Sequence, residues 1–519
     1  MLVVKRMRDQ EHIPGWPASI LTYRDALLHV LMAAPDRIIL YDRAEPIRAD
    51  GFLDRIGIML EVLHPHALVS DAPHRRIGLA LHDNIWSMAA QIACWFLRLS
   101  PLQLDHRQSA DDLRKTVRSN GLALVITRQK RLLAAAAEVM LIADPAGLLA
   151  DAALVAKGRA SLQAASQVPA GPDDLAEFLT SSGVSGPPKI YPATQAQLLA
   201  MTMAVAGNGE RGDWGAALAA VSIVFGGARL IWTRNLLYGR PIHALPLLFT
   251  IVELDQALRD PQIAECTLPP HLIRALVQHA TQDPGSAPRY PHLMKLQSIG
   301  GPALDADKLA AQERLSAHYV MTYSSTETGV VARISGADLR HRPGSCGRPL
   351  HPELVDIVDD AEVPLPPGAI GRIRVKRPYQ LECETKIMMA WPGDLGWLDE
   401  DGYLFIAARG DGIICKNGVN YASAMVEAKL LDCADVADVA VLRLPRAAGD
   451  DDTLIAVRPA GDHIAPQHLA RALRQRLSSH EQPQAIILVG ADDLTPGGKI
   501  RRQAVLEAYT DNPSNMVQI

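Results

Sequence analysis

Short apolar runs alternate with helix-like segments through most of the chain before residue 400. In "SADDLRKTVRSNGLALVIT", Ser109 and Asp112 can cap a helix, Gly121 can end it, and Leu122 to Ile126 is typical of a buried strand. Repetition of this unit predicts an α/β fold with mostly parallel sheets flanked by helices. The Ala-rich stretch from Leu132 to Ala165 is expected to form a surface helix.

The C-terminal part shows a different and shorter pattern. A helix is predicted over residues 422–431, followed by the strands "VADVAVLRL" and "TLIAVRP", the helix "PQHLARALRQRL" and the strand "AIILV". This αββαβ order predicts a compact α+β unit, and glycines at 410, 412 and 418 give the joining segment backbone freedom. With 519 residues the chain is too long for one core, so we expect a large domain over 1–410 and a small domain over 411–519.

Composition restricts the class of protein. Apolar residues make up 48% of the chain and charged residues 21%, and the net charge is -5, as in a soluble globular enzyme without a basic stripe for nucleic acid. The 6 cysteines show no CxxC spacing, so neither a zinc site nor a disulfide framework is expected, and a cytoplasmic location fits. Charge from Lys5 onward and polar residues within 190–209 argue against a signal peptide and a membrane span.

The loop "LTSSGVSGPPKIY", Leu179 to Tyr191, concentrates glycines, prolines, Ser/Thr hydroxyls and one lysine. Backbone amides beside glycine, hydroxyl groups and an ammonium are the groups that hold phosphate oxygens in proteins. The same residue types also build ordinary surface turns. Taken alone, the loop therefore leaves phosphate binding and a structural turn open.

Four further segments follow this loop in order: "SIGGPAL" (298–304), "TYSSTETG" (322–329), a segment from Trp391 to Glu427 that contains "PGDLGW", and "TPGGKIRR" (495–502). Together the five segments resemble the acyl-adenylate-forming (AMP-binding) superfamily of acyl-CoA synthetases, aryl-acid ligases and stand-alone adenylation enzymes. The resemblance runs from about Leu79 to the C-terminus, and residues 1–70 carry no diagnostic feature. It implies an acid-thiol ligase that uses ATP and Mg²⁺ and forms a thioester with the pantetheine of CoA or of a carrier protein.

The resemblance also implies roles for individual residues. The loop that would grip the β- and γ-phosphates comprises Ser181, Ser182, Gly183, Ser185, Gly186 and Lys189. This chain departs from the family pattern at Val184, where threonine is usual, and at Ile190, where glycine is common. Tyr323 would stack on adenine, and Gly300 and Gly301 would form a thin wall against the base. Asp394 would accept hydrogen bonds from the ribose hydroxyls, and Arg409 would contact the nucleotide from the other side.

The remaining roles concern the metal, the chemistry and the motion of the small domain. Glu327 would bind magnesium, and Thr326 and Lys499 would contact the α-phosphate, with Lys499 also reaching the substrate carboxylate. In the family the small domain rotates between the two half-reactions. Asp411 matches the hinge of that motion, and Gly418 belongs to the loop that lines the pantetheine tunnel.

The acid pocket is expected to be walled by residues 221–230, including Val224, Phe225 and Gly226, by Gly300 and Gly301, and by residues 323–325, including Ser324. Because Arg229 is the one cation in that stretch, an apolar aromatic or medium-chain acid is favoured. "STETGVVAR" is similar to ligases that load acyl groups onto carrier proteins, so an acyl carrier protein remains an alternative partner to CoA. An acyl-AMP ligase with another acceptor, a non-catalytic nucleotide- or acyl-binding homologue, and the oligomeric state also stay open.

Overall fold

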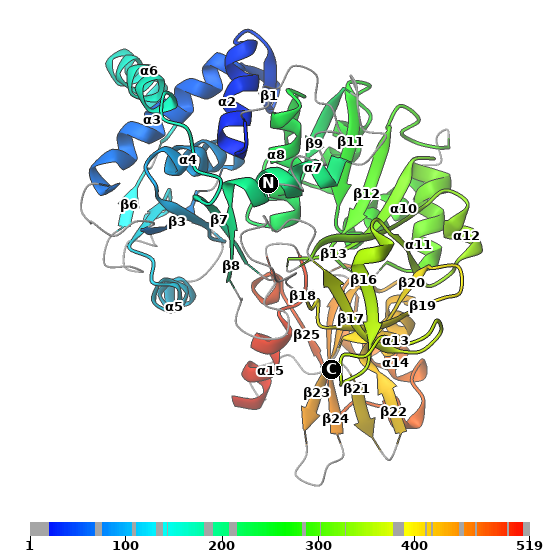
Figure 1. Cartoon of the computed structure of the whole chain (residues 1–519). Helices are drawn as coiled ribbons and strands as arrows, with labels where there is room; N and C mark the ends of the chain where they lie inside the picture. The colour runs from blue at the N-terminus through cyan, green and yellow to red at the C-terminus, as the bar shows by residue number, and fades with distance from the viewer. Residues whose placement is uncertain are drawn as a thin grey trace.

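The computed structural model describes residues 20–511 apart from 68–74, 82, 106–109, 131–138, 143, 181–189, 207–214, 283–286, 302, 327, 377–388, 410–412, 417–418, 446–450, 462–463 and 496–497. The described chain contains a six-stranded sheet, a fourteen-stranded sheet, and a three-stranded and a two-stranded sheet in its C-terminal part (Figure 1). Helices lie against the sheets, which confirms the predicted α/β class. No described helix has both the length and the apolar character needed to cross a membrane.

The six-stranded sheet has the order β6-β5-β3-β4-β7-β8, and all its pairs are parallel except β7 with β8. Its α4 begins where the Asp83 carboxylate accepts hydrogen bonds from the amides of Ile85 and Trp86. Its α5 ends at Gly121, whose φ of +58° lies in the left-handed region. The bounds are β3 (Arg76–Ala80), α4 (Asn84–Phe96), β4 (Ser100–Gln103), α5 (Ala110–Asn120), β5 (Leu124–Thr127), β6 (Val139–Leu141), β7 (Leu175–Thr180) and β8 (Ile190–Thr194).

The first half of the fourteen-stranded sheet is the predicted parallel part. Its order is β2-β1-β10-β9-β11-β12-β13, and every pair from β1 to β13 is parallel. The N-terminal residues join this sheet at its edge, because β1 pairs with β10 and forms a hairpin with β2. The bounds are β1 (Ile38–Asp42), β2 (Glu45–Arg48), β9 (Ala216–Ala219), β10 (Ile242–Ala244), β11 (Ile263–Leu268), β12 (Lys295–Ile299) and β13 (Tyr319–Ser325).

The second half of this sheet is antiparallel. Within the described residues, its connections, such as the one from Leu398 to Leu404, hold no helix long enough for a crossover, which a parallel neighbour would need. The bounds are β14 (Gly329–Ser335), β15 (Ser345–Pro349), β16 (Val355–Val358), β17 (Gly371–Lys376), β18 (Met389–Ala390), β19 (Asp394–Leu398) and β20 (Leu404–Arg409).

Helices between the two large sheets share one apolar cluster with inward residues of both sheets. They are α2 (Tyr23–Ala33), α3 (Ala49–Ala67), α4, α7 (Gln195–Ala206) and α8 (Gly226–Leu237). The face of the fourteen-stranded sheet that points away from the six-stranded sheet is covered by α9 (Ile251–Leu258), α10 (Pro270–Gln282), α11 (Asp305–Ala310) and α12 (Asp338–His341).

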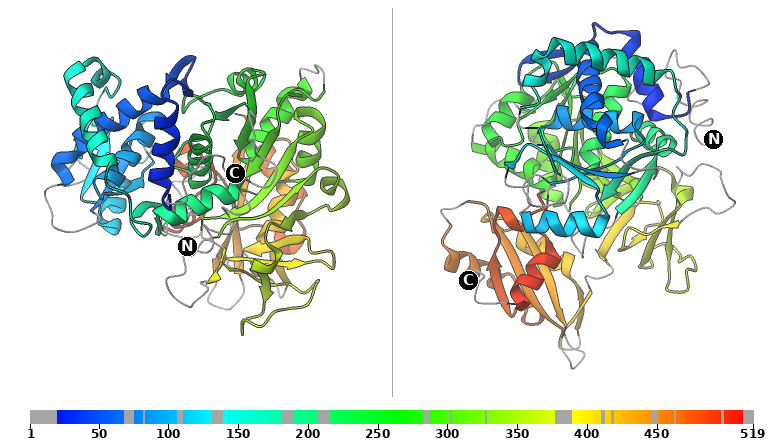
Figure 2. Two further views of the ribbon diagram at one scale, coloured as in Figure 1. Left: turned by 45° about the horizontal axis from the view of Figure 1, so that its top comes forward. Right: turned by 90° about the vertical axis from the view of Figure 1, so that its left-hand side faces the viewer.

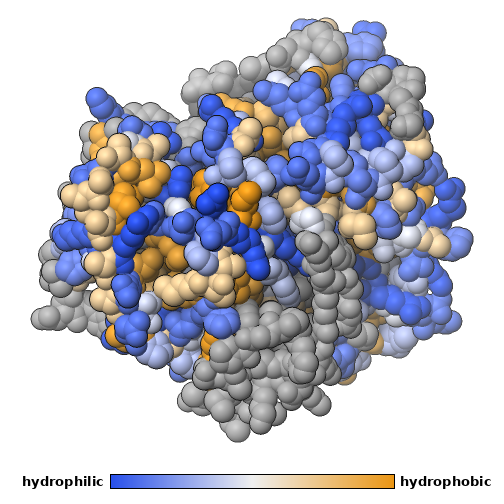
Figure 3. All heavy atoms as spheres, turned by 90° about the horizontal axis from the view of Figure 1, so that it is seen from above, coloured by the Kyte–Doolittle hydropathy of each residue, from blue (hydrophilic) through white to orange (hydrophobic). Residues whose placement is uncertain are grey.

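The Ala-rich stretch is only partly the predicted helix, since β6 precedes α6 (Ala152–Ser166). Glycines let α6 cross α3 closely: a Cβ on Gly57 would lie 2.6 Å from the carbonyl oxygen of Gly158. Gly158 and Leu162 are the buried residues of α6. Seen from above, the surface of the molecule shows apolar areas separated by hydrophilic side chains (Figure 3).

The C-terminal unit has the predicted αββαβ order. Its elements are α13 (Ser423–Leu431), β23 (Val436–Pro445), β24 (Asp451–Pro459), α14 (Pro466–Gln475), β25 (Ala485–Leu488) and a final α15 (Arg502–Asp511), with the pair β21 (Ile413–Lys416) and β22 (Val419–Ala422) before them. It encloses its own apolar clusters on both faces of the three-stranded sheet and lies below the rest of the molecule (Figure 2). The expected domain boundary at 410/411 falls outside the described residues and stays a prediction.

Candidate active site

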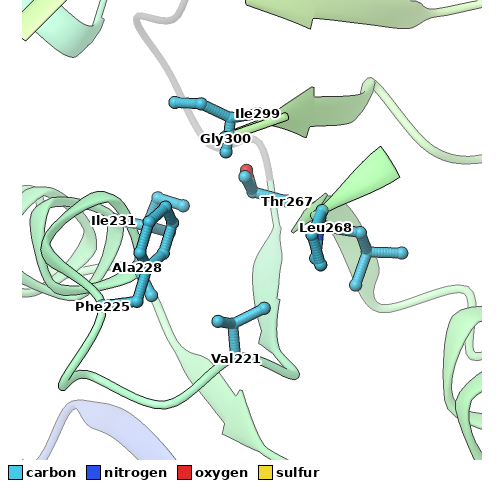
Figure 4. A pocket seen from close by; sticks show the side chains of 9 residues that line it. Val221, Phe225, Ala228, Ile231, Thr267, Leu268, Ile299 and Gly300 are labelled. Atoms are coloured by element: carbon cyan, nitrogen blue, oxygen red, sulfur yellow. The ribbon is translucent and has the colours of Figure 1, made fainter. Parts of the chain in front are cut away.

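A pocket opens at the carboxyl ends of β9, β11 and β12, and Figure 4 shows its walls. Parallel strands end at a common edge, and ligands of open α/β sheets bind in the crevice outside that edge. The pocket is small and partly open to solvent. Its lining residues are Val221, Phe225, Ala228, Ile231, Thr267, Leu268, Pro269, Ile299 and Gly300. All of these except Thr267 are apolar or lack a side chain, so the pocket suits an apolar group.

Three residues of the predicted 221–230 wall, Val221, Phe225 and Ala228, line this pocket, and Phe225 faces Gly300 (Figure 4). Gly300 has a φ of +94°, and a Cβ on it would lie 3.0 Å from Cζ of Phe225. Glycine therefore permits both the turn after β12 and the thin wall beside the ring. Val224, Gly226 and Ser324 do not belong to the lining among the described residues.

Thr267 is the polar side chain of the lining, and the sequence analysis did not select it. Its hydroxyl donates to Oε1 of Gln297 (3.3 Å), and Nε2 of Gln297 donates to the hydroxyl of Thr322 (2.7 Å). This chain of polar groups crosses β11, β12 and β13 beside the apolar pocket. A signal for Thr267 was present in "ECTLPP", where two prolines mark the carboxyl end of an apolar strand.

Arg229 is not a pocket cation. Its Nε lies 2.5 Å from Oε2 of Glu177, and both side chains are only 2% exposed. Its Nη1 also donates to the carbonyl oxygen of Ile223, and Gln91 donates to the same Glu177 oxygen (2.9 Å). The guanidinium is thus neutralised and bonded within the core, and the pocket remains apolar.

Two predicted nucleotide residues meet across different strands. The hydroxyl of Tyr323 on β13 donates to Oδ2 of Asp394 on β19, at 2.5 Å. Arg409 stands opposite Asp394 in the β19/β20 register, but its side chain lies outside the described residues. Thr326 follows β13 in a turn that is closed by a hydrogen bond between the Ser325 and Thr328 hydroxyls (3.0 Å).

Lys499 lies in a turn that its own backbone closes. The amide of Thr495 donates to the carbonyl oxygen of Lys499 (2.6 Å), and the amide of Lys499 donates to the Thr495 hydroxyl (3.1 Å). Cε of Lys499 lies 4.0 Å from the point that a Cβ on Gly301 would occupy. The lysine of the C-terminal unit therefore reaches the loop that follows β12.

His271 on α10 supports the other side of this turn. A Cβ on Gly498, whose φ is +78°, would lie 2.5 Å from Cε1 of His271. Burial, aided by the nearby charge of Arg458, lowers the pKa of His271 to about 3. The imidazole is therefore neutral near pH 7 and adds no positive charge beside Lys499.

Several predicted residues lie outside the described part of the chain, namely Ser181, Ser182, Gly183, Ser185, Gly186, Lys189, Glu327, Asp411 and Gly418. β7 ends at Thr180 and β8 begins at Ile190, on either side of the predicted phosphate loop. Within the described residues no group of three acidic, histidine or cysteine side chains could hold a metal ion. The magnesium role of Glu327 therefore stays a prediction. Among the described residues, Lys499 lies at the loop formed by Gly300 and Gly301.

The chain is similar to a family of known proteins. The profile of a family described as AMP-binding enzyme matches residues 67–383. The chain is 29% identical over 187 residues to the uncharacterized acyl-CoA ligase YhfT of Bacillus subtilis, a match that covers 35% of this chain and 38% of that protein. It is 28% identical over 332 residues to 2-succinylbenzoate-CoA ligase of Geobacillus kaustophilus, covering 61% and 66%. The chain thus aligns with less than two thirds of each of these relatives.

A solved structure extends the likeness over nearly the whole chain. It is the o-succinylbenzoate CoA synthetase of Bacillus subtilis, in complex with its acyl-adenylate intermediate. The TM-score is 0.72, with 18% identity, and the match covers 93% of this chain and 97% of that one. At this identity the likeness shows the common fold.

Proposed function

Because this chain belongs to the AMP-binding enzyme family, as its five segments predicted, we propose that it is an AMP-forming acid-thiol ligase. It would activate an apolar carboxylic acid with ATP and Mg²⁺ and then transfer the acyl group to a pantetheine thiol. The observation that carries this proposal is the approach of Lys499 to Gly301, beside a pocket at the carboxyl edge of the sheet.

The proposed chemistry has two balanced steps. A carboxylate oxygen of the acid attacks the α-phosphorus of ATP, the bond to the β-phosphate bridging oxygen breaks, and pyrophosphate leaves with its electron pair. Negative charge builds on the α-phosphate oxygens and on the leaving pyrophosphate, while the attacking carboxylate loses charge. The Lys499 ammonium would bridge the carboxylate and the α-phosphate and stabilise the charge on the phosphate oxygens. A thiolate then attacks the acyl carbonyl carbon, and AMP leaves as the thioester forms.

The nucleotide would bind on the side of the site formed by β13 and β19. Tyr323 offers an aromatic face, and its hydroxyl orients Asp394, whose carboxylate would accept hydrogen bonds from ribose hydroxyls. ATP is a substrate here, and magnesium would screen its phosphates. Glu327 is the residue proposed to hold that ion, since Mg²⁺ prefers oxygen ligands.

The acid and the acceptor are proposed from the pocket and from the relatives. An apolar lining with one threonine hydroxyl favours an aryl or medium-chain acid over an amino acid. CoA is the first choice of thiol, because the curated relatives named above are CoA ligases. A carrier-protein phosphopantetheine is the second choice, and an amine acceptor would make the chain an acyl-AMP ligase.

The test is acid-dependent exchange of labelled pyrophosphate into ATP, measured with a panel of aryl and acyl acids. We expect exchange with at least one aryl or medium-chain acid and a fall of about 10²- to 10³-fold in Lys499→Ala. ATP binding by calorimetry without exchange for any acid would instead favour a non-catalytic nucleotide-binding homologue. Once an acid is found, CoA, carrier proteins and amines supplied to enzyme preloaded with acyl-AMP identify the acceptor.

A further inference from the structure

One face of α10 carries two side chains that contact the C-terminal unit. His271 packs against Gly498, next to Lys499. Arg274 stands three residues further along the helix, so both side chains project from the same face. Pro270, at the start of the helix, lies 3.6 Å from the point that a Cβ on Gly301 would occupy. The first turns of α10 therefore contact both the loop after β12 and the C-terminal unit.

Arg274 connects the two parts of the molecule by specific hydrogen bonds. Its Nε donates to Oδ2 of Asp307 on α11, at 2.7 Å. Its Nη1 donates to the carbonyl oxygen of Leu431 at 2.8 Å and lies 3.4 Å from that of Val436, both in the C-terminal unit. The arginine side chain is only 12% exposed, so these bonds are largely shielded from water.

The contact with Leu431 has a clear physical basis. Leu431 is the last residue of α13, and the final carbonyl groups of a helix have no partner within that helix. This end of a helix also carries a partial negative charge, which a cation stabilises. Arg274 therefore caps α13 from outside the unit to which α13 belongs.

Neighbouring residues complete the contact. Leu304, between Gly301 and α11, packs against the apolar cluster of the C-terminal unit that includes Leu430 and Val436. Asp307, which orients the guanidinium, lies one turn further along. The loop facing Lys499 and the residues that hold the C-terminal unit therefore belong to one continuous segment.

We propose that Arg274 is a positioning residue, which holds the C-terminal unit so that the Lys499 ammonium lies at the Gly300–Gly301 loop. The inference rests on the proposed function, because it assigns Arg274 an effect on adenylation through Lys499. A planar guanidinium can serve Asp307 and the α13 carbonyls together, whereas a single ammonium offers no such fixed fork. Arg274→Lys is therefore expected to rescue only part of the loss in Arg274→Ala.

The decisive experiment is a double-mutant cycle with Lys499→Ala, read by acid-dependent pyrophosphate exchange. Losing a hydrogen bond from a charged group should lower the exchange rate of Arg274→Ala roughly 10- to 100-fold. In the Lys499→Ala background the same substitution should change the rate hardly at all, since the group that it positions is gone. Equal losses in both backgrounds would show that Arg274 does not act through Lys499 and would overturn the inference.

A matched control is Arg340→Ala. The Arg340 side chain is 63% exposed, and it pairs with Glu313, which also precedes the C-terminal unit. Its replacement should leave exchange at the parental rate. Asp307→Asn, which removes the partner that orients Arg274, should lower the rate in the same direction as Arg274→Ala.

A second readout does not depend on activity. Release of the C-terminal unit should expose His271, so its pKa, followed by NMR, should rise from its lowered value toward 6.5 in Arg274→Ala. Amide exchange at Gly498 and Lys499 should accelerate as well. An unchanged His271 pKa and unchanged amide exchange would overturn the inference even in an active enzyme. If the unsubstituted protein shows no pyrophosphate exchange with any acid, the proposed function is refuted. The NMR measurements would then show separately whether Arg274 holds the C-terminal unit in place.

Discussion

Gly498→Ala adds one methyl group to the turn that carries Lys499. The φ of +78° at this position costs a residue with a side chain roughly 1–2 kcal/mol. The new Cβ would also lie 2.5 Å from Cε1 of His271. Non-bonded carbon atoms prefer about 3.5–4.0 Å, so the turn must move away from α10 by about 1 Å.

That displacement acts directly on the proposed catalytic group. A misplacement of about 1 Å can cost around 100-fold in rate, because the reacting groups no longer meet in the productive geometry. We therefore expect acid-dependent pyrophosphate exchange to fall about 100-fold in Gly498→Ala. The circular dichroism spectrum should remain close to that of the parent, since the turn lies at the edge of the C-terminal unit. The unfolding temperature should fall by several degrees, as a cost of about 1–2 kcal/mol implies.

The control is Gly490→Ala in the same unit. No atom lies within 4 Å of a Cβ at that position, and φ is −103°, so this variant should exchange pyrophosphate at the parental rate. Combining Gly498→Ala with His271→Ala removes the steric contact and should restore part of the activity, measured against His271→Ala alone. Parental exchange activity in Gly498→Ala would show that adenylation does not depend on the position of the Lys499 turn against α10, and would refute this reasoning.

Three further changes test the site. Lys499→Ala should slow adenylation by about 10²- to 10³-fold, as when one charge-stabilising donor is lost, whereas thioester formation from synthetic acyl-AMP should be spared. Tyr323→Phe removes the hydrogen bond to Asp394 and should raise the KM for ATP by up to roughly 10-fold with little change in kcat, in steady-state assays with saturating acid. Thr267→Val keeps the side-chain volume but breaks the bond to Gln297. It should leave turnover of an unsubstituted aryl acid unchanged and abolish any preference for its hydroxylated analogue, compared as kcat/KM.

Local patterns predicted much of the fold. The end of α5 at Gly121 and the strand β5 after it follow from a left-handed glycine and an apolar run, both of which act within a few residues. The predicted cap by Ser109 and Asp112 concerns side chains outside the described residues and stays a prediction. The αββαβ order of the C-terminal unit is equally local. The Ala-rich stretch failed at β6, because this short strand exists through pairing with β5, as between Val125 and Val139. Alanine content favours a helix and contains no information on that partner.

In the candidate site, too, some residues could be predicted from local sequence and others depend on the tertiary structure. Family-like segments selected Gly300, Gly301, Tyr323, Asp394 and Lys499, and the structure brings the two glycines near the lysine and the tyrosine to the aspartate.

The side chains that the sequence analysis missed are Thr267, His271 and Arg274. Their importance depends on which strands end side by side and which face of α10 meets the C-terminal unit. Neither property can be read from residue type and spacing alone.

The edge position of β1 has a consequence for synthesis of the chain. The parallel partner of β1 is β10, which emerges from the ribosome about 200 residues later. At roughly 5–20 residues per second, that interval lasts on the order of 10–40 s. Until then β1 can form only its local hairpin with β2, and its other edge stays open to other chains. β1 can therefore join the sheet only after nearly half of the protein has been made.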